Sequence, residues 1–188
     1  MKKYELVKDN ESGLFRIKAL RDGEFFRKGD LGGLIEMEYN LSHEGDCWVS
    51  YNAHIFGKAW VYGNAQVLGN ARVYDNARVF GDAYILGDAW VYDNASVFGN
   101  ALIFGKALVF GNAVICGDAA IFDAAHICGG QVRGNAWVYG NAGVGGNAWV
   151  YDNASVYGNA EVCGNASVCG NAEVCMDDRI CENTKICG

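Results

Sequence analysis

Histidine is the side chain of this 188-residue chain best suited to acid–base chemistry, because its imidazole titrates near neutral pH. The three histidines are His43, His54 and His126. A zinc site of the histidine type needs three such side chains, two of them closely spaced along the chain. These three are not spaced in that way, so we predict neither a metal site nor a bound cofactor.

Cysteine is the second reactive side chain, with eight copies. Five of them lie six residues apart: Cys163, Cys169, Cys175, Cys181 and Cys187. They occupy a position of a repeat that elsewhere often holds Tyr or Phe. We interpret them as reduced thiols that act as small apolar side chains.

A repeat of six residues must position these side chains, because it fills most of the chain. An apolar, mostly β-branched residue recurs every six positions from Val49 to Ile127. One residue is then lost within the stretch 128–131. The period resumes at Val132 and continues to Ile186, which gives 24 repeats.

Each repeat combines a short strand with a corner. Ala59 and Val61 point to one side of such a strand, whereas Trp60 and Tyr62 point to the other. The following pair Gly63-Asn64 tolerates the positive φ angles of a sharp bend. Alternating strands and corners wind the chain into a helix of polygonal cross-section, and the small residues face its narrow interior. The sequence therefore predicts an all-β solenoid.

The pattern aliphatic-x-Gly-Asn-Ala-x resembles the hexapeptide repeat of left-handed parallel β-helix proteins. The resemblance implies a single-stranded left-handed β-helix in which three repeats form one triangular coil of about 18 residues. For 24 repeats it implies about eight coils. At about 4.8 Å between strands, the helix would be roughly 38 Å long.

A second resemblance concerns the segment that precedes the repeats. Residues 29–35, 40–42 and 45–49 are similar to the N-terminal portion of a family of hexapeptide-repeat proteins from bacteria and their phages, some of which are labelled transferases. We expect a β-hairpin here, because the turn formers at 9–13 separate two strand-like runs. We predict an N-terminal β cap at residues 1–46 and a hexapeptide-repeat β-helix at residues 47–188.

The resemblance also implies where the histidines lie. On coils of 18 residues, His54 and His126 point outward on one face, about 19 Å apart. They are too far apart to share a substrate atom. Hexapeptide acyltransferases use a His as general base beside a loop that projects from the helix, and no loop insertion interrupts these repeats.

The same coils place cysteines side by side. Cys163 stacks beside Cys181 and Cys169 beside Cys187, with Cα atoms about 4.8 Å apart. That distance permits a disulfide or a pair of metal ligands. Stacked reduced thiols are our interpretation, and the oxidised alternative stays open.

The composition limits the kinds of partner that we expect. The formal net charge of −7 argues against nucleic-acid binding, which needs a basic surface. The sequence contains no run of 18 apolar residues, so we predict no membrane-spanning helix. The charged N-terminal residues do not resemble a signal peptide. We expect a protein of the bacterial host cell's cytoplasm.

The outward positions predict association. They form largely aromatic ladders, which stabilise stacked strands by pairing. Residues 95–132, here called the apolar waist, carry only three charges. Such a patch is typical of an interface, and the last repeats end without a capping helix. The candidate interface residues are Leu102, Phe104, Leu108, Phe110, Val114, Phe122, Ile180 and Ile186.

We therefore predict a non-catalytic, self-associating structural or binding protein that presents rigid β-helix faces to a protein partner. The resemblance to phage proteins implies a host or virion protein as that partner. The alternative is a hexapeptide-type acyltransferase with its site at a subunit interface.

Overall fold

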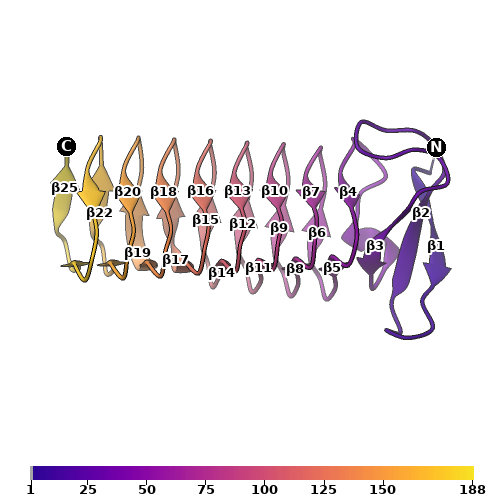
Figure 1. The fold of residues 1–188 in the computed structure, drawn as a ribbon, viewed down its shortest axis with the longest axis horizontal. Helices are drawn as coiled ribbons and strands as arrows, with labels where there is room; N and C mark the ends of the chain where they lie inside the picture. The colour runs from indigo at the N-terminus through magenta and orange to yellow at the C-terminus, as the bar shows by residue number, and fades with distance from the viewer. Residues whose placement is uncertain (1) are drawn as a thin grey trace.

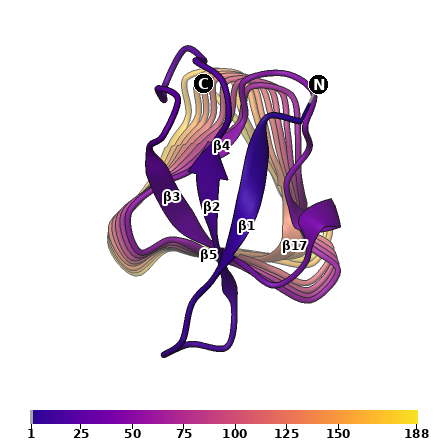
Figure 2. The same cartoon turned by 90° about the vertical axis from the view of Figure 1, so that its right-hand side faces the viewer.

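The computed structural model describes residues 2–188 and shows a rod of stacked parallel β-coils (Figure 1). The described N-terminal residues and the C-terminus lie at opposite ends of the rod. Seen along the axis, the coils superpose in a three-sided outline (Figure 2). The predicted all-β solenoid is confirmed.

Face 1 of the rod is an eight-stranded parallel sheet. Residues on neighbouring strands pair at a spacing of 18 positions, as in Tyr84 opposite Leu102, which shows three repeats per coil. Its strands are β4 (Trp48–Val49), β7 (Gln66–Val67), β10 (Tyr84–Ile85), β13 (Leu102–Ile103), β16 (Ala120–Ile121), β18 (Trp137–Val138), β20 (Ser155–Val156) and β23 (Glu173–Val174).

Faces 2 and 3 belong to the second sheet, and β17 and β19 run through both. Face 2 consists of β3 (Leu31–Ile35), β5 (His54–Ile55), β8 (Arg72–Val73), β11 (Trp90–Val91), β14 (Leu108–Phe110), the first part of β17 (His126–Val132), the first part of β19 (Gly143–Val150), β21 (Glu161–Val162) and β24 (Arg179–Ile180). Face 3 consists of β6 (Trp60–Val61), β9 (Arg78–Val79), β12 (Ser96–Val97), β15 (Val114–Ile115), the second parts of β17 and β19, β22 (Ser167–Cys169) and β25 (Lys185–Cys187).

The rod has about nine turns, one more than the repeat count predicted. Within residues 2–188, face 2 holds nine strands because β3 already pairs in parallel with β5, Leu34 opposite His54. The six-residue pattern did not reveal this first strand, because β3 pairs with β5 at a spacing of 20 residues and so lies out of step with the repeat. A Cβ at Gly33 would lie 2.6 Å from the carbonyl oxygen of Ala53, so the close approach of the next coil excludes a side chain there.

The N-terminal hairpin lies at one end of the rod. β1 (Tyr4–Lys8) pairs antiparallel with β2 (Phe15–Ala19), and β2 pairs antiparallel with β3. A short 3₁₀ helix, η1 (Glu38–Asn40), follows β3. Lys3 is fully buried beside this hairpin, and its ammonium donates to the carbonyl oxygen of Cys47 at 2.7 Å.

The core is a stack of small aliphatic layers. Every inward Ala and Val or Ile from Ala53 to Val138 is fully buried. Burying a Val or Ile side chain contributes about 1.5–3 kcal/mol, which offsets the cost of ordering so many corners. The rod is therefore stabilised layer by layer along its axis, as expected for a solenoid.

The corners need positive φ. Gly99 has φ 73°, and a Cβ there would lie 2.9 Å from the backbone nitrogen of Gly117 in the next coil. Asp75 adopts φ 58° at an equivalent corner, so an aspartate also serves as a corner residue. One corner departs from the rule. At the deletion, β17 and β19 run continuously from face 2 to face 3, with a register shift between Gly129 and Gln131.

Candidate interaction faces

Aromatic ladders line each face, as the outward positions predicted. On face 1, Phe104, Phe122, Tyr139 and Tyr157 stack with ring centroids 4.8, 4.8 and 5.0 Å apart. On face 2, Tyr74 stacks on Tyr92 at 4.9 Å. Such pairs contribute roughly 0.2–1 kcal/mol each, so the ladders stabilise the rod itself.

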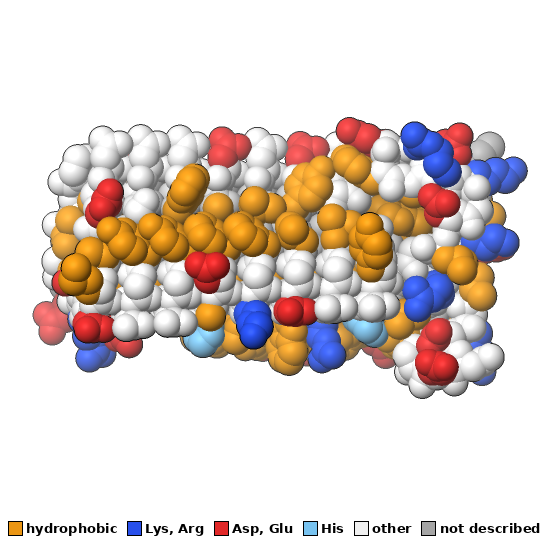
Figure 3. Space-filling model, viewed as in Figure 1, with side chains coloured by type: hydrophobic (Ala, Val, Ile, Leu, Met, Phe, Trp, Pro, Cys, Tyr) orange, Lys and Arg blue, Asp and Glu red, His pale blue; other side chains and the backbone are white. Residues whose placement is uncertain are grey.

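Face 1 also presents a continuous apolar surface. Figure 3 shows a hydrophobic stripe along nearly the whole rod on this side. Between Gln66 and Tyr157, a stretch that the structure describes throughout, no strand of face 1 carries a charged outward residue. Trp137 projects from it with 51% of its surface exposed. A stripe of this kind is typical of a protein interface.

The other two faces carry charges among their aromatic residues. Arg72 lies 5.0 Å above the ring of Trp90 on face 2. Arg133 lies 3.9 Å above the ring of Trp149 on face 3. These guanidinium groups cover aromatic rings, so faces 2 and 3 are less apolar than face 1.

The structure divides the predicted waist residues among all three faces. Leu102, Phe104 and Phe122 lie together on face 1. Leu108 and Phe110 belong to β14 on face 2, whereas Val114 belongs to β15 on face 3. All six are half-buried by their neighbours. One flat partner cannot contact all of them at once.

Sequence reasoning overlooked part of face 1. Leu86, Trp137 and Tyr139 lie in the same apolar stripe, outside the predicted set. On coils of 18 residues the sequence already places Leu86 and Tyr139 in one outward column with Phe104 and Phe122, but the candidate set left them out. The two predicted residues near the C-terminus, Ile180 and Ile186, are partly buried and pack against the core in the last coil.

The histidines do not form a common site. His43 is occupied locally: its Nε2 lies 2.9 Å from a Glu38 carboxylate oxygen, and its Nδ1 accepts from the backbone of Lys3 at 3.2 Å. His54 and His126 lie in β5 and β17 on face 2, with β8, β11 and β14 between them.

His54 differs from the other two histidines. Its Nδ1 is buried and makes no hydrogen bond within residues 2–188. Burial lowers the pKa of His54, and the positive charge of Arg72 acts in the same direction. The imidazole lines a hollow of about 430 Å³ together with Ser12, Glu36 and Arg72. Burial therefore favours the neutral form of this imidazole.

Two cysteine pairs are disulfide-bonded, which corrects our interpretation of them as reduced thiols. Cys163 is joined to Cys181 and Cys169 to Cys187, each pair with Cα atoms 4.5 Å apart. The parallel register brings them together, because Cys169 lies directly opposite Cys187. Disulfides persist mainly in oxidising compartments. The two disulfides therefore argue against the predicted cytoplasmic location, which stays a prediction.

No group of three His, Cys, Asp or Glu side chains in the described part of the chain is placed to hold a metal ion. Within the same residues, no helix is long and apolar enough to cross a membrane.

A comparison with known protein families finds a short match. Residues 71–87 match the family model described as the YdcK beta solenoid repeat. This segment covers β8, one corner and β9, followed by the corner and β10. No curated protein matches the chain. The family match and the stacked parallel coils together show a repeat β-solenoid protein.

Proposed function

We propose that this chain is a non-catalytic, self-associating binding protein of the hexapeptide-repeat class, wound as a left-handed β-helix. Face 1 is its contact surface, and a second copy of the chain is the occupant. The rigid faces left free then bind a further protein, which the phage resemblance suggests is a host or virion component.

The uncharged stripe on face 1 carries this proposal. From β10 to β20 it crosses five strands, or about 19 Å at the usual strand spacing. Two such flat sheets can pack face to face at about 10 Å, as in a β-sandwich. A straight, uniform stripe is complementary to a copy of itself, which suits an isologous two-fold contact.

The oligomeric state tests the proposal. We expect light scattering coupled to gel filtration to give a dimer or larger assembly at micromolar concentration. Leu102→Glu places a charge at the centre of the stripe and should shift the protein to monomer. Ser96→Glu adds the same charge at the equivalent outward position of β12 on face 3, next to Arg78, and should leave the assembly intact.

Two results would count against the contact. A monomeric wild type at these concentrations would remove the need for any interface. Equal effects of Leu102→Glu and Ser96→Glu would show that added charge, and not face 1, governs the assembly.

A second candidate function is acyl transfer at a subunit interface, and His54 is the observation in its favour. His54 lines a hollow, and its imidazole could accept a proton there from an acceptor hydroxyl or amine. Acetyl-CoA should then raise the melting temperature, and His54→Gln should abolish transfer while His126→Gln does not. Absence of any acetyl-CoA effect would exclude this candidate.

A further inference from the structure

A ladder of asparagine side chains runs along the corner between faces 2 and 3. The amide nitrogen of each donates to the amide oxygen of the asparagine one coil further along the rod. The donor–acceptor distances are 3.1 Å for Asn76 to Asn94, 3.4 Å for Asn94 to Asn112, 3.3 Å for Asn147 to Asn165 and 3.2 Å for Asn165 to Asn183. Each rung satisfies one donor and one acceptor.

The ladder is interrupted at the coil where the sequence loses one residue. The corner there consists of Gly129 and Gly130, which have no side chain to offer. Within residues 2–188, the Asn112 amide nitrogen therefore has no acceptor, and the Asn147 amide oxygen has no donor. Reversing both halves of the ladder together exchanges these roles and still leaves one free donor and one free acceptor, whereas reversing one half alone would leave two donors or two acceptors.

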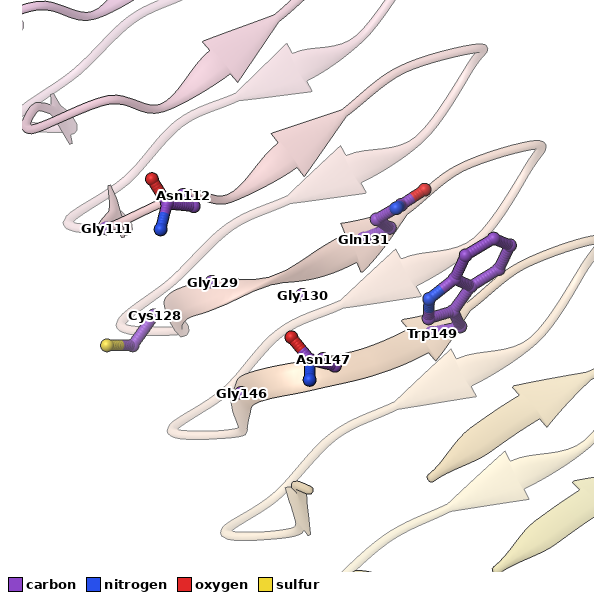
Figure 4. A pocket seen from close by; sticks show the side chains of 9 residues that line it. All are labelled: Gly111, Asn112, Cys128, Gly129, Gly130, Gln131, Gly146, Asn147 and Trp149. Carbon is purple, nitrogen blue, oxygen red and sulfur yellow. The ribbon is translucent and has the colours of Figure 1, made fainter. Parts of the chain in front are cut away.

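A hollow of about 560 Å³ occupies the interruption (Figure 4). Asn112 and Asn147 stand on its two sides, and the bare backbone of Gly129 and Gly130 lies between them. Gln131 and Trp149 lie at one end of the hollow. The missing side chains thus leave a space with polar walls and one aromatic side.

The distance between Asn112 and Asn147 sets the size of the group that fits between them. Asn112 and Asn147 are two strand spacings apart, or about 9.6 Å. One planar amide placed midway would lie about 4.8 Å from each, the separation of every other pair in the ladder. It would accept from Asn112 and donate to Asn147, which restores the two missing hydrogen bonds.

We propose that this hollow binds a primary carboxamide carried on an aromatic ring. The amide replaces the absent rung, and the ring lies toward Trp149, whose indole is 36% exposed and is held by Arg133 at 3.9 Å. The site does not depend on face 1, because it lies on the opposite corner of the rod.

The asparagine ladder also predicts which analogues of the primary carboxamide do not bind. A carboxylate has two acceptors and no donor, so it leaves the Asn147 oxygen unpartnered. A dialkylated amide fails for the same reason. Each of these analogues loses one of the two hydrogen bonds that a primary amide makes in the hollow, so nicotinamide should bind and nicotinate should not.

A titration monitored by the indole N–H resonance of Trp149 tests the proposal, with Trp149→Phe to assign the signal. We expect a saturable shift with nicotinamide and with benzamide, at a dissociation constant on the order of 1 mM for ligands of this size. Nicotinate and N,N-dimethylbenzamide should give no saturable shift. The four ligands are compared on the wild-type protein, and the Trp149→Phe variant serves only to assign the resonance.

A matched pair of variants locates the site. Asn147→Leu should weaken nicotinamide binding roughly fivefold or more, as expected for one lost hydrogen bond. Asn141→Leu removes a similar ladder bond, to Asn159 at 3.1 Å, on the corner between faces 1 and 2, and should leave binding unchanged. Equal binding of nicotinamide and nicotinate, equal effects of the two variants, or no saturable shift at Trp149 would each overturn the proposal.

Discussion

Reduction of the two disulfides should release the last coil of the rod and leave the other coils in place. Each disulfide joins residues 18 positions apart. Cross-linking a loop of that length removes about 3 kcal/mol of loop-closure entropy from the detached state. Because each coil contacts mainly its neighbours, the loss should appear as local opening of the end and not as global unfolding.

Hydrogen exchange measures this opening at particular amides. The backbone N–H groups of Glu161, Cys163 and Ser167 donate to carbonyl oxygens of the last coil at 2.8 Å each. A change of about 3 kcal/mol corresponds to roughly a hundredfold in the opening equilibrium. After reduction, exchange at these amides should therefore rise by about two orders of magnitude. The amide of Ser96, which donates to Ala113 in the middle of the rod, should not change.

The controls separate the disulfides from other effects of the reductant. A Cys181→Ala, Cys187→Ala double variant should exchange like the reduced wild type and show no further response to reductant. Cys116→Ala removes an unpaired thiol and should behave like the wild type. If mass spectrometry finds both disulfides in the starting protein but reduction leaves the exchange of Glu161 and Ser167 unchanged, the disulfides do not hold the last coil and this reasoning is wrong.

Two further predictions concern single residues. Gly99→Ala should lower the free energy of unfolding by at least about 1–2 kcal/mol in urea, because the left-handed conformation and the nearby Gly117 backbone both oppose a Cβ. Gly143→Ala meets nothing closer than 4.0 Å and should change it by less than about 0.5 kcal/mol; equal losses would contradict the corner argument. Burial lowers the pKa of His54 below its ordinary 6.5, so the unfolded chain takes up a proton first as the pH falls. Stability from this residue should be complete above about pH 6.5 and decline below it, and His54→Gln should flatten the pH dependence of the urea midpoint; an unchanged slope would show that His54 is not responsible.

Much of the fold could be predicted because its contacts repeat. The inward Ala and Val positions fix the strand faces, and the Gly-Asn pairs fix the corners. The first strand, β3, escaped notice because Leu34 and Ile35 pair with residues 20 positions further on, and not 18 as in the coils that follow. A pattern search finds positions that resemble one another, whereas β3 is held in place by contacts that no other strand makes.

The sequence by itself determined the period, the inward rows and the single interruption, since each depends on residues close together in the chain. The coil of about 18 residues came from a resemblance. The tertiary structure confirmed it, and which outward residues share a face depends on this parallel register between strands 18 positions apart. It separated Leu102 from Leu108 and Val114, joined Cys169 to Cys187, and left Asn112 and Asn147 facing each other across a gap. The same lost residue is visible in the sequence as a broken period. Only in the stacked coils does the lost residue interrupt the asparagine ladder, because a hydrogen bond between coils requires side chains at equivalent positions of adjacent coils.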